Sequence, residues 1–116
     1  MLITFLKSKI AHATITEAEL YYEGSITIDE NLLEAVGIIS GEKVEVLNIN
    51  TGSRIETYAI AGKSGSGVIC LNGPAARSGA VGDKVIILSY GLLEQNDAKN
   101  FKTKIIQVDE KNKLKK

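Results

Sequence analysis

Apolar residues occur in short runs that turn residues separate along the whole chain. The runs are rich in isoleucine, valine and leucine, and glycine or asparagine often stands between them. Short runs of this kind bounded by turn residues predict strands, so we expect strands at 2–6, 10–16, 26–28, 68–71, 84–90 and 104–108. The run 84–90 is almost continuously apolar, which favours a buried strand.

Residues 43–60 contain two alternating stretches around a break at Asn50-Thr51-Gly52. We expect a hairpin in which Gly52 takes a positive φ, because glycine has no Cβ to oppose this conformation. The glycine-rich stretch GKSGSG, residues 62–67, is predicted to be a flexible turn before the next strand.

Two short helices are expected. Asp29 precedes residues 30–37 as an N-cap candidate, and Gly37 falls where a left-handed residue ends many helices. Pro74 is tolerated in the first turn of a second, very short helix at 72–77. Short strands with two small helices indicate a mainly-β domain that suits a compact barrel.

Composition narrows the class of protein. A chain of 116 residues suits one domain, and its 14 basic and 14 acidic residues create no overall field that would attract nucleic acid or a membrane. Cys70 has no disulfide partner, and no apolar run approaches the roughly 20 residues that span a bilayer. Residues 1–16 lack the features of a signal peptide, so we expect a cytoplasmic protein. The tail at about 110–116 is expected to be a solvated end that need not be ordered.

Three potential sites have a plainer explanation. The Gly62-Lys63-Ser64 triplet matches the end of a phosphate-binding loop, but the first glycine of that motif would be Thr57 and no long helix follows. Cys70 lies within an apolar strand and is expected to be a small buried hydrophobe. One cysteine and one histidine, His12, cannot form a zinc site of cysteine and histidine within one chain, and no metal site is expected.

The Gly24-Ser25 pair has two explanations. Taken alone, it is a turn dipeptide between strands. A serine after glycine can also attack the preceding carbonyl and move the peptide from nitrogen to oxygen as an ester, and elimination and hydrolysis then leave a pyruvoyl group and release ammonia. Serine is a weak nucleophile, so the fold must supply strain, a proton acceptor and donors for the oxyanion.

Several separated segments together favour the second explanation. In order and spacing they resemble the pyruvoyl-dependent aspartate alpha-decarboxylases over about residues 1–90. The matching segments are Leu6 to Ile10, Tyr22 to Ser25 with Ile28-Asp29, Asn50 to Gly52, Arg54 to Tyr58, Asn72 to Arg77, and Gly82 to Ile87.

The resemblance implies a fold and a maturation step. The fold is a six- to seven-stranded double-psi β-barrel with two or three short helices, forming one domain over 1–116. Self-cleavage between Gly24 and Ser25 gives a β chain, 1–24, and an α chain, 25–116. Four chains of each kind form a homotetramer with sites between subunits, and a maturation factor can assist the cleavage.

The resemblance also implies an activity. L-aspartate is decarboxylated to β-alanine and carbon dioxide through a Schiff base with the pyruvoyl group made from Ser25. Neither pyridoxal phosphate nor a metal takes part. The β-alanine serves pantothenate biosynthesis. Tyr58 would be the proton donor. The residues implied in substrate binding are Lys9, Arg54, Thr57, Asn72, Gly73, Pro74 and Ala75, with Thr57 also assisting cleavage.

Geometry and two departures from the family pattern qualify these roles. In a straight strand Arg54 and Tyr58 share one face and Thr57 the other. A bend in the strand or a site completed by a neighbouring subunit would bring them together, and we favour the shared site. The family commonly has histidine where Ala11 stands, and His12 one position later is expected on the opposite face. Pro74, often alanine in the family, lacks a backbone donor. The alternative function is an uncleaved, non-catalytic β-barrel that serves as a binding or assembly module.

Overall fold

The described residues form one eight-stranded sheet with three short helical segments. The computed structural model describes residues 1–22 and 24–115. Its strands are β1 (Leu2–Thr14), β2 (Glu17–Glu19), β3 (Ile26–Asp29), β4 (Lys43–Asn48), β5 (Arg54–Gly62), β6 (Ile69–Asn72), β7 (Lys84–Glu94) and β8 (Lys104–Gln107). The helices are α1 (Glu30–Val36), the 3-10 helix η1 (Gly73–Ser78) and α2 (Gln95–Ala98).

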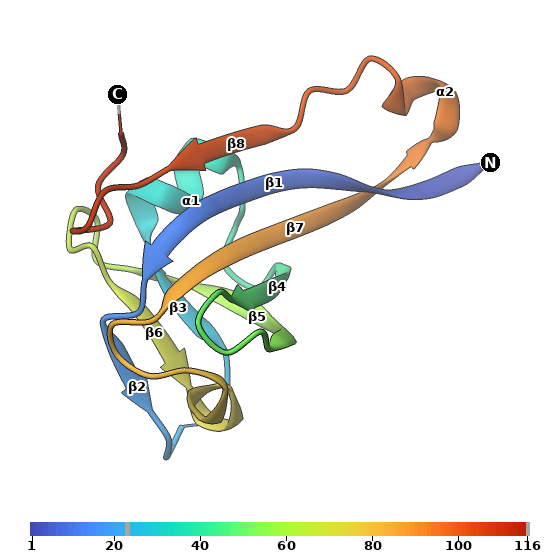
Figure 1. The fold of residues 1–116 in the computed structure, drawn as a ribbon. Coiled ribbons are helices and arrows are strands. Elements are labelled where there is room, and N and C mark those ends of the chain that lie inside the picture. Colours follow the sequence, from blue (N-terminus) through green and yellow to red (C-terminus); the bar gives the residue numbers. More distant parts are fainter. Residues whose placement is uncertain (23, 116) are drawn as a thin grey trace.

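The strands follow the order β2-β6-β3-β5-β4-β7-β1-β8 across the sheet. Strands β1 and β7 run side by side toward the N-terminus, whereas β2 and β6 lie at the opposite end of the molecule (Figure 1). The predicted mainly-β class is confirmed, with eight strands rather than six or seven. Closure into a double-psi barrel stays a prediction.

The strands predicted at 2–6 and 10–16 are largely one continuous strand, β1, with the short β2 after it. The polar residues between the two apolar runs suggested a break. In the fold they are satisfied: Lys7 pairs with Glu42 at 2.6 Å, and the buried Ser8 hydroxyl donates to the carbonyl of Val36 at 2.5 Å. Because these partners lie far away in sequence, the continuity of β1 depends on tertiary contacts.

The predicted helix ends and turn are confirmed. Asp29 caps α1 by accepting from the backbone N–H of Asn31 at 2.8 Å, and Gly37 ends the helix with φ 74°. Gly52 takes φ +79° in the β4–β5 hairpin, as expected. The short helix α2 was not predicted from the sequence.

Aliphatic side chains from most strands and from α1 form a single core. Its fully buried members include Ile10, Ile26, Ile28, Ile69 and Ile87. Ile26 pairs with Leu71 across β3 and β6, so the core residues of these strands alternate with residues on the other face. That other face carries Ser25 and Asn72. Within the described residues, no helix is long and apolar enough to cross a membrane.

The C-terminal segment folds back over the end of β1. Asn112 is buried, its side-chain amide donates to the carbonyls of Thr14 and Gly67, and its Oδ1 accepts from the N–H of Thr14, each at 2.8 Å. Lys113 also donates to the carbonyl of Gly65. Residues 112 and 113 of the segment expected to be a solvated end are therefore attached to the fold, and residue 116 lies outside the described residues.

Candidate active site

The backbone at Gly24 and Ser25 takes an unusual conformation. Gly24 has φ +140° and Ser25 has φ +103°. Glycine adopts such angles readily, but a residue with a Cβ does so only at a cost of roughly 1–3 kcal/mol. Ser25 is also fully buried. A strained serine after a flexible glycine meets one of the conditions for attack on the preceding carbonyl, the strain that the fold must supply.

Asn72 holds Ser25 from the neighbouring strand. Its backbone N–H donates to the carbonyl of Ser25 at 3.0 Å, and its side-chain Nδ2 donates to Ser25 Oγ at 2.9 Å. Asn72 is itself buried. The serine hydroxyl and its backbone are thus fixed by the same residue.

Gly73 allows the chain on either side of Glu23 to approach β6 closely. Its φ is +64°, and a Cβ at this position would lie 2.3 Å from the carbonyl oxygen of Tyr22 and 2.8 Å from the nitrogen of Gly24. Both are backbone atoms, which cannot rotate away as a side chain does. Glycine is therefore required here by contact as well as by φ.

A pocket of about 420 Å³ opens beside Ser25. The lining residues are Gly24, Ser25, Ile55, Glu56, Thr57, Tyr58, Pro74, Ala75 and Ser78. We call it the Ser25 pocket. Five of the residues predicted for substrate binding, catalysis or the pyruvoyl precursor meet in it, namely Ser25, Thr57, Tyr58, Pro74 and Ala75. Asn72 and Gly73 are buried and do not line it.

Strand β5 contributes both of its faces to the Ser25 pocket. Tyr58 is 42% exposed, whereas the next residue, Ala59, is fully buried, as alternation along a strand requires. Thr57 and Tyr58 nevertheless both line the pocket. The sequence had suggested that Thr57 and Tyr58, on opposite faces of the strand, could not line one pocket. In the structure both line it, but Arg54 does not.

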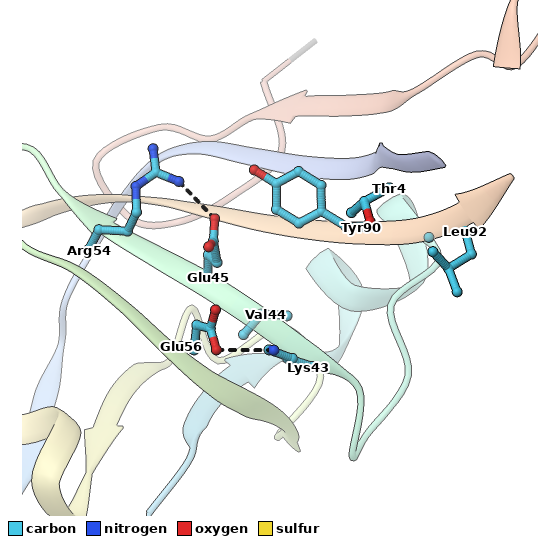
Figure 2. A pocket seen from close by; sticks show the side chains of 9 residues that line it. Thr4, Lys43, Val44, Glu45, Arg54, Glu56, Tyr90 and Leu92 are labelled. Carbon is cyan, nitrogen blue, oxygen red and sulfur yellow. Dashed lines mark hydrogen bonds and ion pairs between the residues drawn. The ribbon is translucent and has the colours of Figure 1, made fainter. Parts of the chain in front are cut away.

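Arg54 lies in a different pocket of about 650 Å³, which we call the Arg54 pocket. There its guanidinium Nη1 contacts Glu45 at 2.8 Å, and Lys43 contacts Glu56 at 3.0 Å (Figure 2). Glu56 lines both pockets. The Arg54 ion pair is exposed, so it costs little to break.

Lys9 also lies away from the Ser25 pocket. It is half-buried in β1, opposite Leu88 of β7 and Ile105 of β8. Within one chain, the two predicted carboxylate-binding cations are therefore separate from the predicted pyruvoyl precursor. Their roles stay predictions.

The single histidine follows the expected shift. Ala11 is buried, whereas His12 is exposed with φ +63° at an irregularity in the pairing of β1 with β7. His12 lines a third pocket with Lys84 and the C-terminal segment. It does not reach the Ser25 pocket.

The glycine-rich turn has a structural role in this fold. The backbone N–H groups of Gly65 and Gly67 donate to the carboxylate of Asp29 at 3.0 and 2.8 Å. Burial by itself raises the pKa of Asp29, but these bonds and that from Asn31 outweigh it and hold the pKa below the usual range. The loop thus binds a carboxylate of its own chain. Separately, the described residues contain no cluster of three or more metal-ligating side chains.

Two residues near Ser25 were missed as site candidates. Thr27 Oγ1 accepts from Asn72 Nδ2 at 2.9 Å, and the Cys70 thiol donates to Asn72 Oδ1 at 3.2 Å. Cys70 is buried, as predicted. The spacing offered a signal, because Thr27 follows Ser25 by two positions and Cys70 precedes Asn72 by two, which places each pair on one strand face.

Known proteins resemble this chain over nearly its whole length. The family model described as aspartate decarboxylase matches residues 1–115. An aspartate 1-decarboxylase of Caldicellulosiruptor saccharolyticus is 60% identical over 98% of this chain and 89% of its own length. Those of Carboxydothermus hydrogenoformans and Leptospira biflexa are 57% and 53% identical, over 98% and 100% of this chain and 90% and 99% of their own lengths.

Proposed function

Because the chain belongs to the aspartate decarboxylase family, we propose that it converts L-aspartate into β-alanine and carbon dioxide. The reaction uses a pyruvoyl group that the chain makes from Ser25 by cutting itself after Gly24. One observation carries the proposal: a strained, buried Ser25 lies at the wall of a pocket that also contains Tyr58. The β-alanine then serves pantothenate biosynthesis in the cytoplasm.

Cleavage begins with attack of Ser25 Oγ on the carbonyl carbon of Gly24. The carbon–oxygen bond forms, the carbon–nitrogen bond breaks, and the hydroxyl proton ends on the released amine. The positive φ of Ser25 raises the energy of the starting peptide, which lowers the remaining barrier. Elimination from the ester frees the Gly24 carboxylate, and hydrolysis of the resulting dehydroalanine releases ammonia.

The residues around Ser25 fit the pyruvoyl group. The Ser25 pocket is open to solvent, and Tyr58 in its lining is partly exposed, so an amino acid can reach the new chain end. Asn72 offers amide N–H donors at the position of the Ser25 hydroxyl. The pyruvoyl group supplies a ketone that takes up the substrate amine and an electron sink, the task that pyridoxal phosphate performs elsewhere.

Tyr58 and Thr57 act from strand β5. The phenol of Tyr58 gives a proton to the carbon that loses carbon dioxide, and the pocket wall keeps that carbon close. Thr57 lines the same pocket as Gly24 and assists cleavage. Pro74 and Ala75 also line the pocket, and Pro74 presents no N–H to the substrate.

Arg54 and Lys9 bind the substrate carboxylates from a neighbouring subunit. A guanidinium offers two parallel hydrogen bonds to the side-chain carboxylate, which survives the reaction. Since neither cation lines the Ser25 pocket of its own chain, the complete site forms between chains of a homotetramer. A maturation factor can assist cleavage without changing this arrangement.

Denaturing intact-mass analysis and carbon dioxide release from aspartate test the proposed function. We expect two fragments, 1–24 and 25–116, the larger carrying a pyruvoyl end, together with β-alanine production. Ser25→Ala should stay a single chain and be inactive. A wild-type chain that stays uncut and releases no carbon dioxide would instead support a non-catalytic binding or assembly module.

Mixing inactive chains tests the shared site. Ser25→Ala and Arg54→Ala chains, co-expressed in equal amounts, should recover about a quarter of wild-type sites on random assembly, because Ser25 and Arg54 then come from different chains. The matched control mixes Ser25→Ala with Tyr58→Phe. These two residues line one pocket of one chain, so no recovery is expected. Equal recovery in both mixtures, or none in either, would contradict the shared site.

A further inference from the structure

Four polar side chains lie on one face of β3 and β6. The strands are antiparallel, with Thr27 opposite Cys70 and Ile26 opposite Leu71. Continuing this register places Ser25 opposite Asn72, and the bond from the Asn72 N–H to the Ser25 carbonyl agrees. We call Ser25, Thr27, Cys70 and Asn72 the serine cluster.

The side chain of Asn72 lies at the centre of the serine cluster. Its Nδ2 donates to Ser25 Oγ and to Thr27 Oγ1, both at 2.9 Å. Its Oδ1 accepts from Cys70 Sγ at 3.2 Å. Ser25, Cys70 and Asn72 are all at least 96% buried, so water does not readily replace these bonds.

An asparagine amide can be placed in two ways that differ by exchange of its oxygen and nitrogen. In one, the amide donates to the hydroxyl of Ser25. In the other, the amide oxygen accepts a hydrogen bond from the Ser25 hydroxyl, so the hydroxyl hydrogen is engaged with Asn72. The group facing Oδ1 favours the first placement: a carbonyl oxygen is a good acceptor for an S–H donor, whereas in the second placement the amide NH₂ would have only a thiol sulfur, a weak acceptor, as its partner.

Cys70 provides this donor as a neutral thiol. Burial raises the pKa of Cys70, and the negative charges of Glu17 and Glu19 on the adjoining strand β2 raise it further. The thiol therefore keeps its hydrogen at neutral pH. A thiol is a weak donor, but here it acts on a carbonyl oxygen that is removed from solvent.

We propose that Cys70 is a positioning residue for self-cleavage: its S–H group orients the Asn72 amide so that Asn72 donates to Ser25 Oγ. This leaves the Ser25 hydroxyl hydrogen free to move toward the proton acceptor of the attack. Thr27 supports the same placement by accepting the second amide hydrogen. The inference rests on the proposed function and adds a residue that touches neither the pocket nor the substrate.

The test compares four purified precursors by the rate at which the intact chain disappears in denaturing mass spectrometry. Cys70→Ser keeps a donor on the same carbon, whereas Cys70→Val keeps the bulk and burial but has no donor. We expect Cys70→Ser to cleave near the wild-type rate and Cys70→Val to cleave about three- to tenfold more slowly, the size of effect for one hydrogen bond. Ile69→Val, in the same strand but facing the core, should cleave at the wild-type rate.

Folding is controlled in the Ser25→Ala background, where no chain is cut. The unfolding temperatures of the Cys70 variants measured there should all lie well above the temperature of the cleavage assay, so that differences in cleavage rate do not come from unfolding. Cys70→Val cleaving as fast as wild type, or Cys70→Ser as slowly as Cys70→Val, would overturn the role of the thiol while the proposed function stands. A wild-type chain that never cleaves would overturn the proposed function and this inference with it.

Discussion

Gly73→Ala should block self-cleavage while leaving a folded chain. In the structure the new Cβ would lie 2.3 Å from the Tyr22 carbonyl oxygen and 2.8 Å from the Gly24 nitrogen. Ordinary contacts begin near 3.5 Å, so the chain that carries Gly24 must move by about 1 Å. In the wild-type structure the side-chain and backbone N–H groups of Asn72 lie at hydrogen-bonding distance from Ser25. A displacement of about 1 Å would separate Ser25 from these donors.

The cost divides into two parts that a control can separate. Alanine at a left-handed φ costs roughly 1–2 kcal/mol, and the backbone clash adds about 1–3 kcal/mol. Gly52 has φ +79° but no atom within 4 Å of its added Cβ, so Gly52→Ala carries the first part alone. With about 4 °C of unfolding temperature per kcal/mol, Gly73→Ala should unfold about 4–12 °C below Gly52→Ala.

Two measurements check this prediction. Unfolding temperatures are compared at one protein concentration in the Ser25→Ala background, because cleavage and assembly otherwise shift them. Cleavage is followed by intact mass in chains that keep Ser25. Gly52→Ala should cleave like the wild type and Gly73→Ala should stay uncut. If both variants cleave equally fast, the close approach of β6 does not position Ser25 and the reasoning is wrong.

Three further predictions follow from the same structure. Tyr58→Phe should give a cleaved protein whose turnover of aspartate is at least a hundredfold lower, because general acid catalysis contributes about 10²–10⁴-fold; unchanged turnover would remove Tyr58 as proton donor. Asn112→Ala should lower the free energy of unfolding in urea by about 1–3 kcal/mol, because it leaves buried backbone groups of Thr14 and Gly67 unpaired, whereas the exposed Asn100→Ala should change it little. Since the pKa of Asp29 is lowered in the folded chain, its stabilising effect should be complete above the ordinary carboxyl pKa near 4 and be lost as pH falls below it. Acid titration of the unfolding free energy should therefore be less steep below pH 4 in Asp29→Asn, and an equal slope would contradict the role of the loop.

Local patterns predicted those elements whose causes lie within a few residues. Asp29 and Gly37 fixed the ends of α1, and the break around Gly52 fixed the β4–β5 turn, because capping and positive φ are properties of single positions. The burial of Cys70 followed from its apolar neighbours. Strand β1 was divided in two because its polar residues find partners, Glu42 and Val36, that are distant in sequence.

The sequence by itself determined the family resemblance, since the Gly24-Ser25 pair and the segments around Arg54 and Asn72 are readable in the order of the chain, and from it the site residues were predicted. Only the tertiary structure decided how they are arranged. Pairing of β3 with β6 brings Asn72 to Ser25, and the same pairing makes Cys70 and Thr27 partners of that amide. The tertiary structure also places Arg54, at the start of β5, in a pocket other than the Ser25 pocket of its own chain. The physical reason is that strand register, which long-range packing sets, decides which side chains meet across a sheet.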